Sequence, residues 1–407
     1  MSAHIRPGYK LTEAGVIPQD WESGSLGRFW DVTDCKHITA EFVSTGGIPV
    51  ASIREVQSKY IDLDNAKKTT EKDYLSLIEG GRKPQSGDLI MSRNATVGEV
   101  AQVEEWHPPF AMGQDVCLLR KKSKNYSTSY LQTVFKSPVI VNQLTNLMVG
   151  STFKRINVEQ IRNFSVPMPP VHEQRAIGGI LSDMDALISG LDQLIAKKRD
   201  IKQATMQQLL SGKQRLPGFS GEWVVKRLGD LANIKTGSRN NQDKVQDGQY
   251  PFFVRSATVE NINSFSLDCE AILVPGEGNI GSIFHYINGR FDVHQRVYAI
   301  TQFAPDTSGK FVYLYMIMHF GAHAMQNSVK ATVDSLRLPT FQSFEITLPP
   351  SKDEQSAITT ILSDMDRELT TFETRRDKAR ELKLGMMQEL LTGRIRLSQS
   401  SQEAKLC

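Results

Sequence analysis

The chain has 407 residues, of which 40% are hydrophobic and 23% charged, and its formal net charge is +3. This length suits two or three domains with buried cores, and the composition excludes a disordered or low-complexity protein. No run of about 18 or more apolar residues is present, and the N-terminus lacks the basic-then-apolar order of a signal peptide, so we expect a cytoplasmic protein without a membrane partner. The mild basicity permits nucleic-acid binding without requiring it.

The four cysteines, Cys35, Cys117, Cys269 and Cys407, lie far apart and form no C-x-x-C pair. This spacing argues against a zinc ribbon, an iron–sulfur site or a disulfide framework. We expect reduced thiols and no metal site.

The first 165 residues are predicted to form a mixed α/β domain. An apolar strand with a glycine-containing turn covers 87–98 (GDLIMSRNATVG), and a second strand begins at Gln114 (QDVCLLR). A short amphipathic helix follows over 129–137, and a polar loop, GSTFKRIN, covers 150–157. The domain therefore ends in a polar loop.

One long helix is predicted within residues 166–215. Pro169 and Pro170 favour extended backbone before it, and Gly212 stands where a glycine ends a helix. About 40 helical residues span about 60 Å. An apolar stripe follows this helix: Ile177, Ile180, Leu181, Met184, Leu187, Ile188, Leu191, Leu194, Ile195 and Ile201.

Residues 216–345 repeat this order of signals in a second domain. The linker LPGFSGEW covers 216–223, and a strand with a glycine-containing turn, AILVPGEGNIG, covers 271–281. A second strand again begins at a glutamine, Gln295, and a helix and a polar loop follow at 311–320 and 329–337. The two segments are not close copies, so we expect a shared scaffold with different surfaces.

A second long helix is predicted within residues 346–397, before a tail at 398–407. Ser351-x-x-Glu354 has the spacing of a capping box, and Gly393 stands at the expected end. Its apolar stripe contains Ile358, Ile361, Leu362, Met365, Leu369, Phe372, Ala379 and Leu382.

The two long helices are copies of one another. Residues 173–216 align with 354–397 at a constant offset of 181, and 20 of the 44 pairs are identical, which indicates an internal duplication. Each helix either packs on its own domain or packs on the other helix. We favour the second arrangement, because about 60 Å exceeds the width of a domain of about 150 residues.

These repeats resemble the DNA-sequence specificity subunit of type I restriction-modification systems over nearly the whole chain. The similar segments are PMPPVHEQRAIGGILSDMD and LPPSKDEQSAITTILSDMD, MQQLLSGKQRL and MQELLTGRIRL, and DLIMSRNATVG. The resemblance implies an α+β fold with two α/β target-recognition domains separated by two long antiparallel coiled-coil helices.

The resemblance also implies partners. Double-stranded DNA with a bipartite site would be read by the two domains, two methyltransferase subunits would dock on the helices, and ATP-dependent restriction subunits would join through them. S-adenosylmethionine, ATP and Mg²⁺ are expected on those partners, and no cofactor is expected in this chain. Candidate helix–helix and partner-interface positions are Ile177, Leu181, Met184, Ile188, Leu191, Ile358, Leu362, Met365, Leu369 and Phe372.

Candidate DNA contacts are polar side chains at the predicted strand ends and in the loops before the long helices, because Arg, Lys, Asn and Gln reach base edges while Ser and Thr hold phosphates. In the first domain they are Ser92, Arg93, Asn94, Thr96, Gln114, Thr152, Lys154 and Arg155. In the second they are Arg239, Asn240, Arg255, Asn279, Gln295, Arg296, Lys330 and Thr332. Arg93 and Arg296 are the first choices for base reading. The alternative for each is an ordinary solvated side chain.

Motifs that suggest catalysis fail on inspection. Gly276-x-Gly278-x-x-Gly281 follows a strand, but a strand-like segment comes after it, so a glycine-rich hairpin or binding loop is favoured over a dinucleotide site. His107-Pro-Pro-Phe110 lacks the Asn or Asp that leads the similar adenine-methyltransferase tetrapeptide. His319 and His323 lack the further ligands of a zinc protease, and no phosphate-binding G-x-x-x-x-G-K-[ST] is present.

The sequence therefore predicts a non-catalytic specificity subunit that reads a bipartite DNA site and scaffolds methyltransferase and restriction subunits. The alternative is an orphan or modification-only reader without a restriction partner. A self-sufficient enzyme is disfavoured by the missing motifs.

Overall fold

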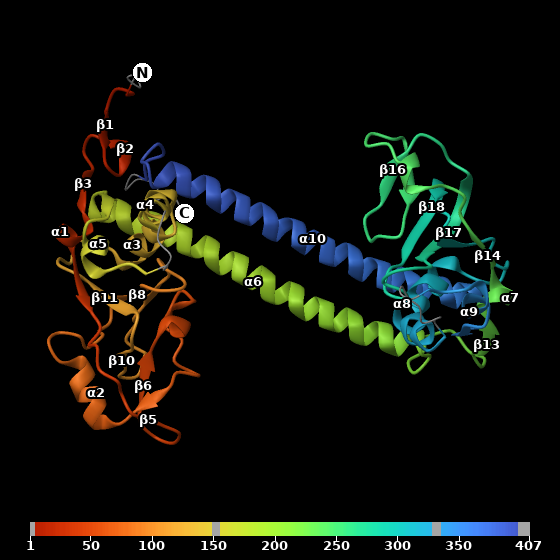
Figure 1. Ribbon diagram of the computed structural model, residues 1–407, viewed down its shortest axis with the longest axis horizontal. Helices are drawn as coiled ribbons and strands as arrows, with labels where there is room; N and C mark the ends of the chain where they lie inside the picture. The colour runs from red at the N-terminus through yellow and green to blue at the C-terminus, as the bar shows by residue number, and fades with distance from the viewer. Residues whose placement is uncertain (1–4, 149–154, 328–334, 398–407) are drawn as a thin grey trace. The chain divides into compact units, whose positions relative to one another are not determined.

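The computed structural model describes residues 5–148, 155–327 and 335–397. The chain divides into two compact units. Unit 1 contains Met1–Leu191 and Arg375–Cys407, and unit 2 contains Asp192–Thr374. The two long helices, α6 (Val171–Leu210) and α10 (Lys352–Leu390), are each divided between the units (Figure 1). Each unit is thus built from a globular part, the beginning of one long helix and the end of the other.

Unit 1 contains two four-stranded sheets and two small strand pairs. In the main sheet every pairing is antiparallel, in the order β4 (Trp30–Asp34), β11 (Val116–Lys121), β8 (Leu89–Ser92), β9 (Val100–Gln102). The second sheet has the order β10 (Ala111–Met112), β6 (Ile48–Ala51), β7 (Lys68–Thr69), β5 (Phe42–Val43). The pairs are β1 (Tyr9–Thr12) with β2 (Gly15–Pro18), and β3 (Glu22–Ser25) with β12 (Ser165–Met168).

The shorter helices of unit 1 surround these sheets. They are α1 (Leu26–Phe29), the 3-10 helix η1 (Ile53–Val56), α2 (Glu71–Ile78), α3 (Thr128–Phe135), α4 (Pro138–Met148) and α5 (Val158–Arg162). The predicted helix at 129–137 corresponds to α3, whose first turn is capped by the Ser127 hydroxyl. The sequence analysis did not predict α4.

Unit 2 is built around one six-stranded sheet. Its order is β14 (Asn233–Thr236), β19 (Val297–Thr301), β17 (Leu267–Pro275), β18 (His285–Val293), β15 (Tyr250–Phe253), β16 (Glu260–Ile262). A separate pair joins β13 (Val224–Arg227) to β20 (Glu345–Leu348). The helices are α7 (Leu228–Leu231), the 3-10 helix η2 (Asn241–Asp243), α8 (Gly309–Gln326) and α9 (Leu338–Gln342).

The duplication extends through the globular parts, as the shared order of signals predicted. The antiparallel order β4-β11-β8-β9 recurs as β14-β19-β17-β18. Cys117 lies opposite Asp34, and Tyr298, which follows it by 181 residues, lies opposite Thr236. The parallel pairing of β10 with β6 likewise recurs between β18 and β15. Positions in the two units can therefore be matched by strand register.

Each globular core includes both long helices. In unit 1, Ile177 and Leu181 of α6 share a core with Leu390 of α10 and its neighbours. In unit 2, Ile358 and Leu362 of α10 occupy the equivalent place. These four positions were predicted as helix–helix or partner contacts. Their burial at 0–1% leaves them no exposed surface for another subunit, so they belong to the domain cores instead.

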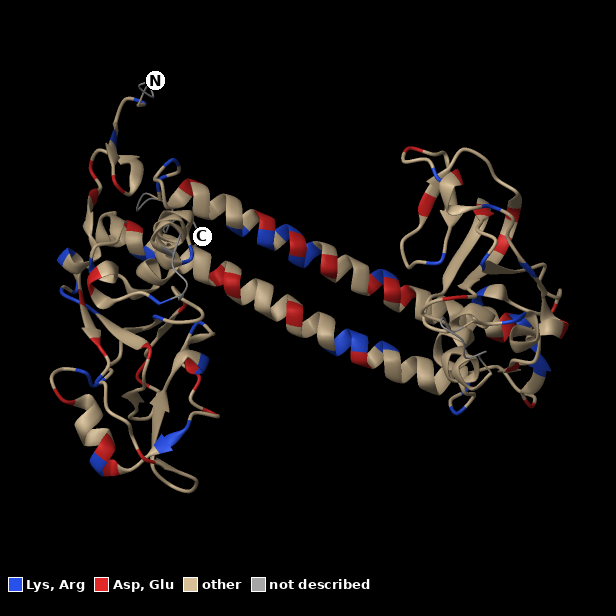
Figure 2. Cartoon of the chain, in the orientation of Figure 1, with Lys and Arg blue, Asp and Glu red and all other residues tan. Residues whose placement is uncertain are grey.

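Further along the helices, the apolar stripe lies between α6 and α10 only in part. Leu191 and Leu369 are buried, whereas Met184, Ile188, Met365 and Phe372 are half-buried. Leu187, Ile201 and Leu382 of the same stripe are exposed. Ion pairs join the helices beside the stripe: Lys198 with Glu368 and Lys202 with Asp366 in unit 2, and Lys383 with Asp185 in unit 1 (Figure 2). Partner numbers fall along α10 as they rise along α6, so the helices are antiparallel.

Both predicted glycine stops are confirmed. Gly212 and Gly393 adopt φ +70° and +67°, a conformation that glycine reaches without strain. The predicted capping box is wrong in one half. The Ser351 hydroxyl accepts the Asp353 amide, but the Glu354 carboxylate accepts two bonds from the Arg215 guanidinium, which draw it away from the helix end.

None of the helices in the described ranges is long and apolar enough to cross a membrane.

Candidate nucleic-acid interface

Three segments meet at the same place in each unit. In unit 1, the amide of Arg93, after β8, donates to Asp115 before β11, and the amide of Ile156 donates to the Arg93 carbonyl at 2.9 Å. In unit 2, Gly276 donates to Arg296 at 2.9 Å and Leu336 donates to Gly276 at 2.8 Å. The strand ends and the segment before α5 or α9 are thereby joined, as expected for a contiguous binding surface.

In unit 1, the exposed candidates lie around this junction. Thr96 and Gln114 are exposed, Asn94 is half-buried, and Arg155 forms a 3.3 Å ion pair with Asp115 while its side chain stays 52% exposed. Ala95 and Asp115 have φ of +57° and +62° without being glycine, and such strain is concentrated at functional sites. The junction therefore offers amide, hydroxyl and guanidinium donors to a ligand.

Two candidates of unit 1 are turned inward. Ser92 is fully buried and donates to the Asn94 carbonyl. Arg93 is 3% exposed, with Nη2 2.6 Å from Asp34 Oδ1 and 3.7 Å from Cys35 Sγ. A guanidinium held in this way cannot reach a base edge, so the choice of Arg93 as a base-reading residue is corrected: it stabilises the junction from beneath.

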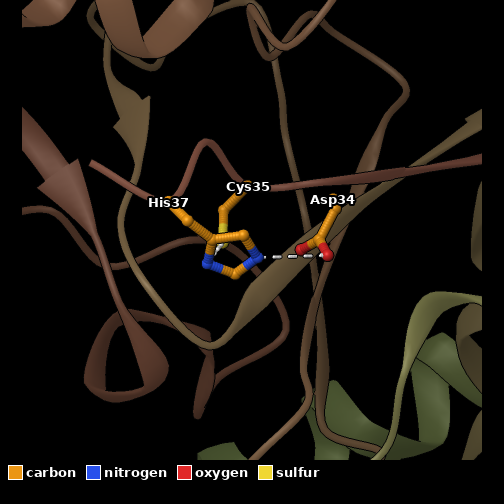
Figure 3. A group of neighbouring side chains, drawn as sticks. All are labelled: Asp34, Cys35 and His37. Atoms are coloured by element: carbon orange, nitrogen blue, oxygen red, sulfur yellow. Dashed lines mark hydrogen bonds and ion pairs between the residues drawn. The ribbon is translucent and has the colours of Figure 1, made fainter.

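The residues beneath Arg93 resemble a metal site. Asp34, Cys35 and His37 place a carboxylate oxygen, a thiol and an imidazole nitrogen within 4.8 Å of one another (Figure 3). The Arg93 guanidinium, however, already supplies the positive charge that Asp34 requires. Burial also raises the pKa of the Cys35 thiol, whereas a metal ligand must be a thiolate. We therefore assign the cluster to holding Arg93.

In unit 2, three arginines lie near the junction in different settings. Arg255 and Arg296 both pair with Glu277, at 3.4 and 3.1 Å, and remain more than half exposed. Arg239 instead donates to the buried Asp292 at 3.0 Å and to Ser264, so its guanidinium is engaged within the fold. Arg255 and Arg296 keep donors free for DNA, and Arg239 serves mainly to support the loop.

Amide side chains complete the surface of unit 2. Asn240 accepts a hydrogen bond from Gln295, and both are exposed, as is Asn279. His294 precedes Gln295, and its Nδ1 accepts the Arg296 amide at 3.0 Å, which requires the unprotonated form of that nitrogen. Desolvation, with nearby Arg255 and Arg296, lowers the pKa of His294. Thr152, Lys154, Lys330 and Thr332 lie outside the described residues.

Sequence reasoning missed the acidic partners Asp115 and Glu277. Each lies among the predicted binding residues, one after Gln114 and the other between Gly276 and Gly278. Paired arginines are held in fixed positions by such carboxylates, which orients their remaining donors. An acidic residue inside an otherwise basic and polar loop was the signal available.

The motifs set aside for catalysis have structural places. The loop at 276–281 connects the antiparallel strands β17 and β18, which agrees with the predicted glycine-rich loop. The His107 ring contacts the Ile61 carbonyl at 2.9 Å and fixes a loop. His323 likewise contacts the Thr340 carbonyl from α8.

Known proteins resemble this chain in sequence and in fold. Residues 18–198 and 220–380 match the family described as the type I restriction modification DNA specificity domain. A putative type I restriction enzyme MjaX specificity subunit of Methanocaldococcus jannaschii is 24% identical, over 96% of this chain and 97% of its own length. The EcoDI specificity subunit of Escherichia coli is 28% identical, over 42% of this chain and 37% of its own length.

Two solved structures are similar in fold. The type I restriction-modification S subunit of M. genitalium has a TM-score of 0.63 at 14% identity, covering 91% of this chain and 96% of its own. The HsdS subunit of Thermoanaerobacter tengcongensis has a TM-score of 0.50 at 17% identity, covering 93% and 98%.

Proposed function

Because the chain belongs to the family of type I restriction-modification DNA specificity domains, we propose that it is the non-catalytic subunit that reads a bipartite double-stranded DNA site. The observation that carries the proposal is the duplicated junction. Each unit presents polar side chains on equivalent strand ends, but with different residues: Asn94, Thr96, Gln114 and Arg155 in one, Asn240, Arg255, Asn279, Gln295 and Arg296 in the other. Equivalent positions with different donors suit two different half-sites.

The partners follow from this role. We propose that two methyltransferase subunits dock on the exposed faces of α6 and α10 and that ATP-dependent restriction subunits join through them, in the cytoplasm. Leu187, Ile201 and Leu382 supply apolar contact area on these faces. S-adenosylmethionine, ATP and Mg²⁺ would be bound by those partners.

The test is the methylated DNA motif in cells that express the full chain with its methyltransferase subunits. Arg296→Ala should relax one position of one half-site, because loss of a base-reading arginine costs about 1–3 kcal/mol. Arg290→Ala is the matched control, since Arg290 pairs with Asp268 on the exposed part of β18 rather than at the junction. An unchanged motif in the Arg296 variant would remove that residue from base reading.

A second measurement tests the assignment as a non-catalytic subunit. The purified chain, incubated with DNA and either S-adenosylmethionine or ATP and Mg²⁺, should neither methylate nor cut it. Turnover by the isolated chain would refute the proposal. Methylation without restriction of unmodified DNA in cells with the complete operon would favour the modification-only alternative.

A further inference from the structure

A pocket lies beside the junction at the same place in both units. In unit 1 it has a volume of 420 Å³ and is bordered by Gly113 and Gln114, which precede β11. In unit 2 the pocket has a volume of 380 Å³ and is bordered by His294. The amides of Gly113 and His294 make the same bond, to Ala51 and Phe253 at 2.8 and 3.0 Å. The two pockets are therefore equivalent parts of the duplicated fold.

The residue lining has diverged while the location has not. By strand register, Ser52 corresponds to Val254, and Arg54 corresponds to Ser256. An arginine thus lines the pocket of unit 1 where a serine lines that of unit 2. A pocket retained at one place with altered chemistry is expected where two copies of a reader contact DNA differently.

The unit 1 pocket carries positive charge that is not compensated locally. Lys36, Arg54 and Lys67 line it, with Glu55 as the single carboxylate. The Glu55 carboxylate accepts bonds from the Ser52 amide and hydroxyl, and Lys36 pairs with Glu79. Among the described residues, Arg54 and Lys67 have no ion-pair partner; both are exposed, and Lys67 Nζ lies 5.0 Å from the centre of the Phe42 ring.

The unit 2 pocket is different in charge. Its cations are paired with carboxylates of the same pocket, Lys244 with Glu260 at 3.3 Å and Arg255 with Glu277 at 3.4 Å. A pocket with paired charges favours neutral hydrogen-bonding groups such as base edges. A pocket with two unpaired cations favours an anion, and a phosphate oxygen is the anion that DNA supplies.

We propose that the unit 1 pocket binds a backbone phosphate of the DNA beside its half-site, with Arg54 and Lys67 as the ligands and Gln114 at the border toward the junction. This inference rests on the proposed function. The pocket anchors unit 1 without reading sequence, so the two halves of one reader differ in how much of their affinity depends on charge.

The experiment measures binding of the full chain, co-purified with methyltransferase subunits, to a cognate duplex and to a scrambled duplex over a range of salt. Arg54→Ala and Lys67→Ala should each weaken both duplexes equally and reduce the slope of log K against log salt by about 0.9. The weakening at 50 mM salt should therefore exceed that at 200 mM by about 3.5-fold. Lys72→Ala, on exposed α2 outside the pocket, is the matched control and should leave the slope unchanged.

A gain-of-charge variant tests the same idea in the other unit. Ser256→Arg places a guanidinium at the position that corresponds to Arg54 and should increase the slope by about 0.9. Arg54→Lys retains the charge and should retain the slope. Duplexes with one neutral methylphosphonate each should include a position at which the Arg54→Ala effect disappears.

The outcomes separate the pocket from the function. If the wild-type complex does not prefer the cognate duplex, the proposed function fails. If it does, but Arg54→Ala and Lys67→Ala leave affinity and slope unchanged, the pocket proposal alone is overturned. A change in preferred sequence in the Arg54 variant would indicate base reading instead. Saturable binding of inorganic phosphate or ATP to the free chain, with DNA affinity unaffected by the variants, would assign the pocket to a small phosphate compound.

Discussion

Arg396 should be one of the most sensitive positions for the stability of unit 1. Its guanidinium donates to both oxygens of Glu173 at 2.8 and 2.9 Å and to both oxygens of Asp20 at 2.9 and 2.8 Å. Glu173 is 1% exposed, so its carboxylate has no water in place of this partner. Arg215 and Glu354 form the equivalent pair in unit 2, 181 residues earlier in each case.

The expected cost of Arg396→Ala follows from the burial of Glu173. Removing one partner of a buried ion pair costs about 3–5 kcal/mol. Two features place this case near about 3 kcal/mol: the Arg396 side chain is 40% exposed, and Glu173 retains a bond from the Trp21 indole at 3.0 Å. The exposed Asp20 pair adds at most about 1 kcal/mol.

Amide hydrogen exchange is the suitable assay, because it reports opening of β3 and the Trp21 region separately from unit 2. Arg394→Ala is the matched control: its pair with Glu389 is largely exposed, and its loss should change stability by less than about 1 kcal/mol. Pairing Arg396→Ala with Glu173→Gln should recover part of the loss. A loss below about 1 kcal/mol for Arg396→Ala alone would refute the reasoning.

The pair also predicts an acid dependence. Hydrogen bonding by Arg396 lowers the pKa of Asp20 from 3.8. This contribution is therefore present above the ordinary value and is lost as the pH falls through the lowered one. Arg396→Ala should remove that part of the acid sensitivity.

Three further predictions concern neighbouring glycines, a histidine and the inward arginine. Gly178→Ala should destabilise unit 1 by about 1–3 kcal/mol, because the new Cβ would lie 2.8 Å from the Tyr130 amide nitrogen, whereas Gly179→Ala meets nothing within 4 Å and should stabilise α6 by up to about 1 kcal/mol in chemical denaturation. His294 should titrate below 6.5 by NMR, and since protonation then favours the unfolded chain, stability of unit 2 should fall as the pH drops below that value; a pKa at or above 6.5 contradicts this. Arg93→Met should lower stability by about 1–3 kcal/mol without altering the methylated motif, and a changed motif would restore Arg93 as a reader.

The long helices and their ends could be predicted because the signals are local. Gly212 and Gly393 end helices through their own backbone freedom, and the repeated apolar stripe has a helical period. The strand order and the loop positions were also accessible once the duplication was recognised. The two α/β domains with antiparallel long helices agree with the fold predicted through the resemblance.

The orientation of individual side chains could not be predicted, because it depends on partners distant in sequence. Arg93 turns inward since β11 and β4 bring Asp34 beside it, although 58 residues separate Arg93 from Cys35, its other neighbour. Sequence could not show that Ser92 is fully buried or that Arg54 and Lys67 share a pocket. Such contacts follow from strand register, which a single sequence does not specify.

The inclusion of the end of α10 in the core of unit 1 affects how the protein is made. Leu181 emerges from the ribosome about 210 residues before Leu391, its companion in that core. At about 5–20 residues per second, the first domain waits about 10–40 s for the helix that completes it. During that interval Ile177 and Leu181 lack part of their apolar cover. The first domain to be synthesised is therefore among the last to finish folding, and a nascent chain halted before residue 387 should be a substrate for chaperones.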